Sequence, residues 1–296
     1  MMRNCAAVIG AVNIDVCGRP NGRLLLRDSN PGVVRYTPGG VGRNIAHNLR
    51  LLGTEVHFLT VFGDDPFGRM LCQDCAERGM HLELSEQIPG MRTSTYLYIT
   101  DEQGEMQLAL SDTDISRCIT PAFLAERLPR LENVSAVVID ANLTEETLAW
   151  IAEHVRTPLF ADPVSVAKAA RLRPVLPKLH TFKPNLAEGR SLTGRESPED
   201  VVSALLDLGV RRVFLSLGSD GMLAGEGESR VMLPCLPTRM VNTNGGGDAA
   251  MAALVWAFLH GKDLEASTMA ALRAGRCAVE YDGTNNPALC ADLLKS

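Results

Sequence analysis

Hydrophobic residues in this chain form short apolar runs that alternate with longer amphipathic stretches. The runs predict strands at residues 6–10, 56–61, 136–140, 159–162, 180–182 and 212–217. Near-continuous apolar strands separated by helices are typical of a parallel sheet that is covered on both faces. The pattern therefore predicts an α/β fold with a mostly parallel central sheet.

Two early helices have clear start and stop signals. Ile45, Leu49 and Leu52 follow a run of glycines with the spacing i, i+4 and i+7, and Gly53 comes directly after them. This spacing predicts a helix that has one buried face and ends at a glycine. Pro66 introduces a second predicted helix over about 67–78, because proline is tolerated in a first helical turn.

A few further strands lie outside this strand–helix rhythm. Alternating apolar and polar residues at 93–100 and 105–110, on either side of a turn at 101–104, predict a hairpin. Residues 16–37 are rich in turn formers and include a short predicted strand at 33–36. We therefore predict a small β-sheet lid, formed by 16–37 and 91–113, over a core formed by 1–15, 38–90 and 114–296.

Three successive glycines, Gly245, Gly246 and Gly247, precede Asp248 and a long apolar run. This order predicts a tight turn that leads into the N-terminus of a helix. Unpaired amides at the positive end of the helix dipole form an anion site, and phosphate suits it. Asp248 is then a candidate general base for a hydroxyl that attacks phosphorus. The alternative is an acidic residue that only stabilises the helix N-terminus, and this stretch by itself leaves both readings open.

Polar residues near the amino terminus are candidates for holding a ligand. Asn13 and Asp15 follow the first strand, where open α/β sheets bind their ligands, although turn formation explains them equally well. Gly39 and Gly40 would let a substrate lie against the backbone, with Asn44 in hydrogen-bonding reach. Gly40 and Gly42 fit the first two glycines of the dinucleotide-binding pattern G-x-G-x-x-G, but residue 45 is Ile instead of the third glycine.

A second group of candidates follows the later strands. Asn185 and Glu188, three residues apart beside Lys183, suit a hydrated Mg²⁺ near phosphates, although the motif by itself favours an ordinary helix start. The turn that contains Gly218 and Gly221 suits the floor of a nucleotide pocket or a plain hairpin.

Composition narrows the class of protein. The 296-residue chain has a formal net charge of −6, which argues against nucleic acid or an anionic membrane as its main partner. The longest apolar runs fall well short of the roughly 20 residues that span a bilayer. The eight cysteines are scattered, and the single C-x-x-C, at Cys72 and Cys75, lies in a helical pattern without further zinc ligands nearby. We expect reduced thiols and a cytoplasmic location.

The motifs at 39–44, 185–188 and 242–248 resemble, in this order, those of the ribokinase-like (phosphofructokinase B) family of sugar and nucleoside kinases. The resemblance covers nearly the whole chain. The family pattern Asp-Thr-x-Gly-Ala-Gly-Asp is altered at Asn242, Asn244 and Gly246, while Asp248 is kept. The resemblance implies a three-layer α/β/α fold with a small β lid, and a homodimer formed through that lid.

Further strings, at 28–32, 93–96, 162–165 and 284–287, are similar to those of family members that act on a uracil-bearing nucleoside. The resemblance implies ATP and Mg²⁺ as cofactors, with a monovalent cation such as K⁺ as an optional addition, and a small nucleoside as substrate. It assigns catalysis to Asp248 with Gly245, Gly246 and Gly247, and substrate binding to Asn13, Asp15, Ser29, Asn30, Gly39, Gly40, Asn44, Thr93 and Tyr96. It assigns cofactor binding to Lys183, Asn185, Glu188, Ser216, Gly218, Gly221 and Asn285, and metal binding to Asn185 and Glu188.

Two rival functions stay open at this point. One is another nucleoside or sugar kinase on the same scaffold, with ribose or adenosine as acceptor. The other is a non-catalytic ligand-binding relative, which the altered residues at 242, 244 and 246 keep in view. Asp248 argues against the second, because a pure phosphate binder gains nothing from a carboxylate there.

Overall fold

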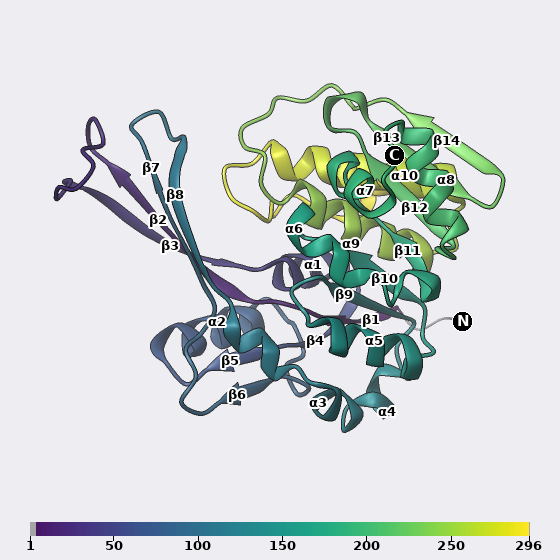
Figure 1. Cartoon of the computed structure of the whole chain (residues 1–296), viewed down its shortest axis with the longest axis horizontal. Helices are drawn as coiled ribbons and strands as arrows, with labels where there is room; N and C mark the ends of the chain where they lie inside the picture. Colours follow the sequence, from purple (N-terminus) through teal and green to yellow (C-terminus); the bar gives the residue numbers. More distant parts are fainter. Residues whose placement is uncertain (1–3, 296) are drawn as a thin grey trace.

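The main body of the protein is a twisted eight-stranded sheet with helices on both faces (Figure 1). The computed structural model describes residues 4–295, so the ends of the predicted core at 1–3 and 296 lie outside it. The strands, in spatial order, are β14 (Ser229–Leu233), β13 (Met222–Glu226), β12 (Arg212–Ser216), β11 (Leu179–Phe182), β10 (Leu159–Asp162), β9 (Ala136–Asp140), β1 (Cys5–Ile9) and β4 (Glu55–Leu59). All neighbouring pairs are parallel except those made by β13 and β14 at one edge, which confirms the predicted, mostly parallel sheet.

Two helical layers enclose this sheet. One contains α1 (Val41–Leu51), α2 (Pro66–Glu77), α9 (Gly246–Leu259), α10 (Leu264–Val279) and α11 (Ala291–Lys295). The other contains α3 (Pro121–Ala125), α4 (Leu128–Leu131), α5 (Glu145–His154), α6 (Val166–Ala169), α7 (Leu186–Thr193) and α8 (Pro198–Asp207). Alternate residues of β1 pack into the two layers, which is why its sequence is apolar without a period of two.

The early helix predictions are confirmed. Ile45 and Leu49 on α1 are fully buried, and the chain leaves the helix through Gly53 at φ +77°. Pro66 is the first residue of α2, and the side chain of Asp65 caps that helix by accepting a hydrogen bond from the Gly68 amide. Among residues 4–295, no helix is both long and apolar enough to cross a membrane.

A second sheet of four strands projects from the body (Figure 1). Its order is β3 (Gly32–Gly39), β2 (Asn13–Pro20), β7 (Thr95–Thr100) and β8 (Met106–Asp112), and β7 with β8 forms the predicted hairpin. Two details differ from expectation. The strand predicted at 33–36 extends over all of β3, and Asn13 and Asp15 lie within β2 instead of a turn. Both follow from pairing, because β3 satisfies the backbone of β2 along its whole length.

The chain between β4 and β7 forms a third sheet, which has two strands. The apolar run predicted at 56–61 divides at Thr60, after which β5 (Val61–Gly63) pairs with β6 (Glu86–Ile88).

Candidate active site

The carboxyl ends of four neighbouring strands lie together, and three of them are followed or ended by a charged residue. Gly10 follows β1, Asp140 ends β9, Asp162 ends β10 and Lys183 follows β11. Parallel strands present these ends at one edge of the sheet, where α/β proteins bind ligands. The close approach of α1 to this edge depends on glycine, because a Cβ on Gly42 would lie 2.8 Å from the backbone of Gly10.

The predicted glycine turn is the N-terminus of α9. Gly245 adopts φ +77°, and the carbonyl oxygen of Thr284 leaves no room for a Cβ there. No side chain caps the helix, so the first amides of α9 have no intrahelical partner. This end of the helix therefore has the properties of an anion site.

Asp248 lies in the first turn of α9 and faces α1. Its Oδ2 accepts a hydrogen bond of 2.9 Å from Nδ2 of Asn44. Burial raises the pKa of Asp248 to about 7, helped by the negative charge of Asp162, while Asn44 and Lys183 act in the opposite direction. The carboxyl group therefore changes its protonation state near neutral pH, where a general base is most effective.

Arg43 fixes the orientation of the Asn44 amide. Its Nη1 donates to Oδ1 of Asn44 at 3.1 Å, which turns Nδ2 of Asn44 toward Asp248. Arg43 is itself buried and held by an ion pair of 2.7 Å with Asp74 on α2 and by Oδ1 of Asn285.

Lys183 and Asp162 form a buried ion pair beside the glycine turn. Nζ of Lys183 lies 3.1 Å from Oδ2 of Asp162, and the two residues are 5% and 6% exposed. Burial alone lowers the pKa of Lys183, but the carboxylates of Asp162, Glu188 and Asp248 outweigh it, so the pKa is raised and the ammonium stays charged. A Cβ on Gly247 would lie 3.4 Å from this ammonium, so the positive charge is next to the turn.

Asn13, Asp15, Gly39 and Tyr96 meet at the root of the projecting sheet. Nδ2 of Asn13 donates to Oδ1 of Asp15 at 2.6 Å, and a Cβ on Gly39 would lie 2.5 Å from the other carboxylate oxygen. Tyr96 pairs in register with Asp15 and shares its face of the sheet. Burial raises the pKa of Asp15 to about 6, despite the hydrogen bond from Asn13.

A hollow of about 340 Å³ lies between the start of α7 and the turn after β12, and Asn185, Ser216 and Gly218 are among the residues that line it. Gly221 closes the turn that bounds it and donates its amide back to Gly218 at 3.3 Å. This hollow brings together three of the seven residues predicted for cofactor binding, namely Asn185, Ser216 and Gly218.

Asn185 and Glu188 form a reciprocal capping box at the start of α7. Oδ1 of Asn185 accepts the amide of Glu188 at 2.9 Å, and Oε2 of Glu188 accepts the amide of Asn185 at 2.8 Å. The helix-start reading of this motif is therefore correct in geometry. It leaves the second carboxylate oxygen of Glu188 outside the cap, and burial raises the pKa of this group.

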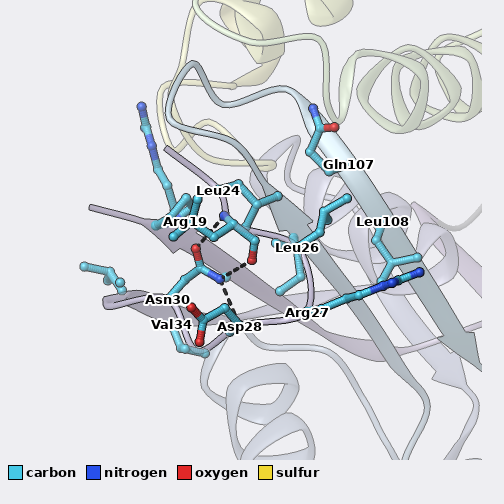
Figure 2. A pocket seen from close by; sticks show the side chains of 15 residues that line it. Arg19, Leu24, Leu26, Arg27, Asp28, Asn30, Val34, Gln107 and Leu108 are labelled. Atoms are coloured by element: carbon cyan, nitrogen blue, oxygen red, sulfur yellow. Dashed lines mark hydrogen bonds between the residues drawn. The ribbon is translucent and has the colours of Figure 1, made fainter. Parts of the chain in front are cut away.

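Ser29 and Asn30 do not join the other predicted substrate-binding residues. They lie in the loop that joins β2 to β3, beyond Pro20, and the length of an extended β2 puts Pro20 about 23 Å from Asn13. The Asn30 side chain binds its own loop, through the backbone of Leu25 at 2.8 Å and of Asp28 at 3.0 Å (Figure 2). The loop covers a hollow of about 470 Å³ on one face of the small sheet.

Thr93 and Asn285 are also engaged within the fold. The Thr93 hydroxyl donates to Oδ1 of Asp65 at 2.6 Å, and the residue is 2% exposed. Nδ2 of Asn285 donates to the backbone of Asn44 and to Oδ1 of Asn48, both at 3.0 Å, so Asn285 holds α1 instead of bordering the hollow.

The sequence-based list omitted Asp140, Asp162 and Arg43, which complete this cluster. Asp140 is fully buried and accepts the amides of Ala11 and Asn142 at 2.8 and 2.9 Å. The signal was present, because a charged residue directly after a fully apolar strand is where a site is expected.

Asn242, which replaces the usual acidic residue, has a local structural role. Its Nδ2 donates to the carbonyl of Tyr281 at 2.5 Å, and its Oδ1 accepts the amide of Asn244 at 2.6 Å. A carboxylate lacks the N–H that the first contact needs, so the amide suits the turn before the glycines.

Comparison with known proteins decides the family. The model of the pfkB family carbohydrate kinases matches residues 4–290. The chain belongs to the PfkB family of carbohydrate kinases. It is 38% identical to the pseudouridine kinase of Escherichia coli K12, over 97% of this chain and 94% of that protein. It is also 35% identical to an uncharacterized sugar kinase, YeiI, of the same organism, over 96% and 81% of the two chains.

The fold is that of the ribokinase-like kinases. The ribokinase of Arabidopsis thaliana, solved with ribose and ATP, superposes with a TM-score of 0.87 over 100% of both chains at 22% identity. The predicted three-layer fold with a small β sheet is thereby confirmed. This PfkB kinase is an ATP-dependent phosphotransferase that acts on a hydroxyl group of a sugar or nucleoside.

Proposed function

We propose that this PfkB kinase transfers the γ-phosphoryl group of ATP to the 5′-hydroxyl of pseudouridine. The observation that supports this acceptor is the 38% identity to a pseudouridine kinase over nearly the full length of both chains. The placement of Asp15 and Tyr96 on one face of the small sheet, at its root, agrees with a polar ring and a ribose being held there.

In the proposed mechanism, Asp248 accepts the proton of the 5′-hydroxyl as that oxygen attacks phosphorus. Asn44 orients the carboxylate, since its amide donates to Oδ2. The amides of Gly245, Gly246 and Gly247, at the uncapped end of α9, stabilise the negative charge on the transferring group, and Lys183 adds a full positive charge beside them. The ribose hydroxyls bind Asn13, Asp15, Gly39 and Gly40.

Residues at the strand ends suit Mg²⁺, which ribokinase-like kinases use with ATP. The carboxylates of Asp162, Glu188 and Asp248 act on the ammonium of Lys183, and repulsion from Asp162 contributes to the raised pKa of Asp140, Glu188 and Asp248. Bound Mg²⁺ would relieve this excess of negative charge and neutralise the phosphates. Asn185 and Glu188 would hold the ion through its water ligands. ATP would occupy the hollow lined by Ser216 and Gly218. Binding of a monovalent cation such as K⁺ stays a prediction from the family resemblance.

Pseudouridine should be phosphorylated with a kcat/KM at least about 10²-fold above that of ribose. The physical reason is that site groups which hydrogen-bond the base are left unpaired by a ligand without one. An ADP-release assay over pseudouridine, uridine and ribose makes the comparison, and uridine tests whether the position of the base matters. Equal efficiency for pseudouridine and ribose would contradict the proposed acceptor.

Another sugar or nucleoside acceptor is the second candidate. The 35% identity to an uncharacterized sugar kinase supports it, because this identity is close to the 38% identity to the pseudouridine kinase. Adenosine and fructose 6-phosphate in the same assay distinguish the two.

We also propose that the enzyme is a cytoplasmic homodimer joined through the small sheet. One face of this sheet is apolar in all four strands, since paired residues share a face. Its members are Val16, Val34, Tyr36, Leu97, Ile99, Leu108 and Leu110. Leu108 is 57% and Leu110 62% exposed, although a sheet with one apolar face ordinarily buries that face. In a dimer with two-fold symmetry, the apolar face of one copy would cover the same face of the other copy, so that a single contact buries both.

The double variant Leu108→Lys/Leu110→Lys should be monomeric where the parent is dimeric, because two charges cannot be buried at such an interface. Sedimentation equilibrium measures the mass. Met232→Lys, which places a charge at an exposed apolar residue of β14, is the matched control and should leave the mass unchanged. A dimer that survives the double substitution would contradict this interface.

A further inference from the structure

Donor side chains for a metal collect at the end of the central sheet opposite the active site. Cys5 of β1 pairs in register with Glu55 of β4, and His57 lies two residues further on the same face. His57 in turn pairs with His81, so this ring belongs to the same face. The cluster is about 16 Å from Gly10, given the length of five extended residues in β1.

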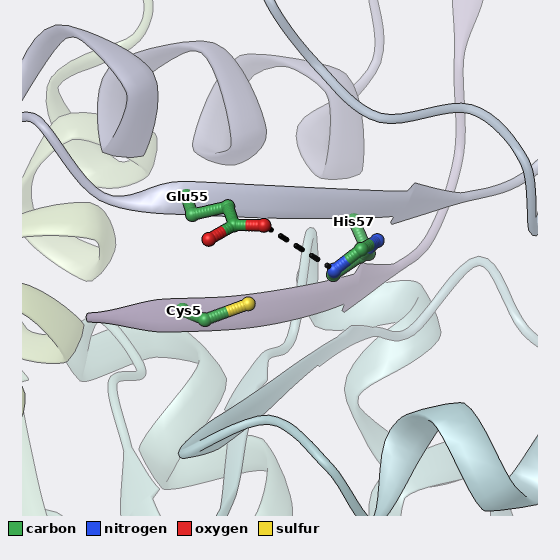
Figure 3. A group of neighbouring side chains, drawn as sticks. All are labelled: Cys5, Glu55 and His57. Atoms are coloured by element: carbon green, nitrogen blue, oxygen red, sulfur yellow. Dashed lines mark ion pairs between the residues drawn. The ribbon is translucent and has the colours of Figure 1, made fainter. Parts of the chain in front are cut away.

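The donor atoms already lie close to one another. The thiol of Cys5, a carboxylate oxygen of Glu55 and a ring nitrogen of His57 are all within 4.8 Å of each other (Figure 3). Oε1 of Glu55 is 3.9 Å from Nε2 of His57 and 3.8 Å from Nε2 of His81. Among residues 4–295 this is the one such group of three or more donors.

Glu83 gives the His57 ring the orientation that a metal ligand needs. Its Oε1 lies 2.7 Å from Nδ1 of His57, and a carboxylate only accepts, so this nitrogen donates the hydrogen bond and Nε2 is the ring nitrogen nearer to Glu55. Metal-binding histidines usually donate their second N–H to a carboxylate in this way. In the tautomer with the proton on Nδ1, Nε2 of His57 and the carboxylate of Glu55 face each other as two acceptors, an arrangement that a metal cation stabilises.

We propose that Cys5, Glu55, His57 and His81 bind one Zn²⁺ ion, with Glu83 holding the His57 ring. Thiolate, imidazole and carboxylate are the ligands that Zn²⁺ prefers, in sets of four. Small side-chain rotations would bring the donors to bonding distance. The sequence does not reveal this site, because its donors are 50, 2 and 24 residues apart and acquire their proximity through strand pairing. The ion would join β1, β4 and the segment after α2, and it would take no part in phosphoryl transfer.

The test uses the chelator-treated full-length protein, dialysed against Zn²⁺ in an excess of Mg²⁺ that occupies the active-site carboxylates. We expect one Zn²⁺ per chain and a higher melting temperature with zinc. Cobalt(II) in place of zinc should give the thiolate-to-cobalt charge-transfer band, and Cys5→Ser should remove it. Glu83→Gln should weaken zinc about 10–100-fold, and His57→Gln, which removes a ligand, should weaken it further.

His154→Gln is the matched control, because it removes an exposed histidine of α5 that is not among the clustered donors and should leave zinc binding unchanged. All of these variants should keep the kinase activity of the parent, which separates this proposal from the proposed function. His57→Gln changes a partly exposed side chain and serves as the decisive variant if Cys5→Ser fails to fold. Zinc affinity that is equal in the parent and in His57→Gln would overturn the site and leave an ion-pair cluster around a protonated His57.

Discussion

Asp248→Asn should lower kcat by about 10²–10⁴-fold, the usual contribution of a general base. The substitution keeps the size of the side chain. It also keeps a side-chain oxygen, which accepts the hydrogen bond that the Asn44 amide donates to Asp248 at 2.9 Å in the parent. It removes the ability to accept a proton from the attacking hydroxyl. ATP binding should persist, because a negative charge near the γ-phosphate is removed. Steady-state kinetics with an independent measurement of ATP affinity make the test.

The pH dependence provides a second measurement on the same residue. The pKa of Asp248 is raised from 3.8 to about 7, so the carboxylate that acts as a base forms as the pH rises through 7, and kcat of the parent should rise with it. A raised pKa in the folded state means that stability from this group is present at low pH and is lost as the pH rises through about 7. At pH 8 the Asn variant should therefore melt at a higher temperature than the parent.

The contrary outcome is equally specific. An Asp248 that only favours the helix N-terminus would, when replaced by Asn, cost roughly 0.3–1 kcal/mol of stability and leave kcat near that of the parent. A kcat within a few-fold of the parent, together with a lower melting temperature, would remove Asp248 from the mechanism.

Lys183→Met should lower the free energy of unfolding by about 3–5 kcal/mol, because it leaves the buried carboxylate of Asp162 without its partner. The ammonium lies 3.1 Å from that carboxylate, and both residues are nearly inaccessible to solvent. Urea denaturation at pH 7.5 measures the change. Lys183 also lowers the pKa of Asp248, so the remaining activity should shift its pH dependence upward.

The double variant Lys183→Met/Asp162→Asn is the control for this prediction. Asn keeps an oxygen for the amide of Val164, which Oδ1 of Asp162 accepts at 2.8 Å, but removes the uncompensated charge. Most of the lost stability should return, since replacing both members of a buried pair is often close to neutral. Activity should stay low in both variants. A Lys183→Met variant as stable as the parent would contradict the stabilising role of this ion pair.

Much of the fold follows from local features of the sequence. The fully apolar strands predict burial on both faces, because an extended chain with apolar residues at every position has no face for water. The turn at Gly245 to Gly247 and the acid after it also read directly, since positive φ and an uncapped helix start impose a local requirement for glycine. Asn44, Lys183 and Asp248 are also candidates because of local signals, since Asn44 and Asp248 follow glycine runs and Lys183 follows a predicted strand.

Their interactions depend on the tertiary structure. Asn44 meets Asp248 across 204 residues, and Lys183 meets Asp162 across neighbouring strands, contacts that the strand order creates. The tertiary structure also decides which predicted binding residues are already engaged within the fold. Thr93 and Asn285 carry suitable polar groups, but those groups bind Asp65 and α1. The sequence determines which side chains are available and which local shapes they favour. Packing alone decides which polar groups satisfy one another inside the fold and which face the site, because a hydrogen bond depends on distance in space and not on separation along the chain.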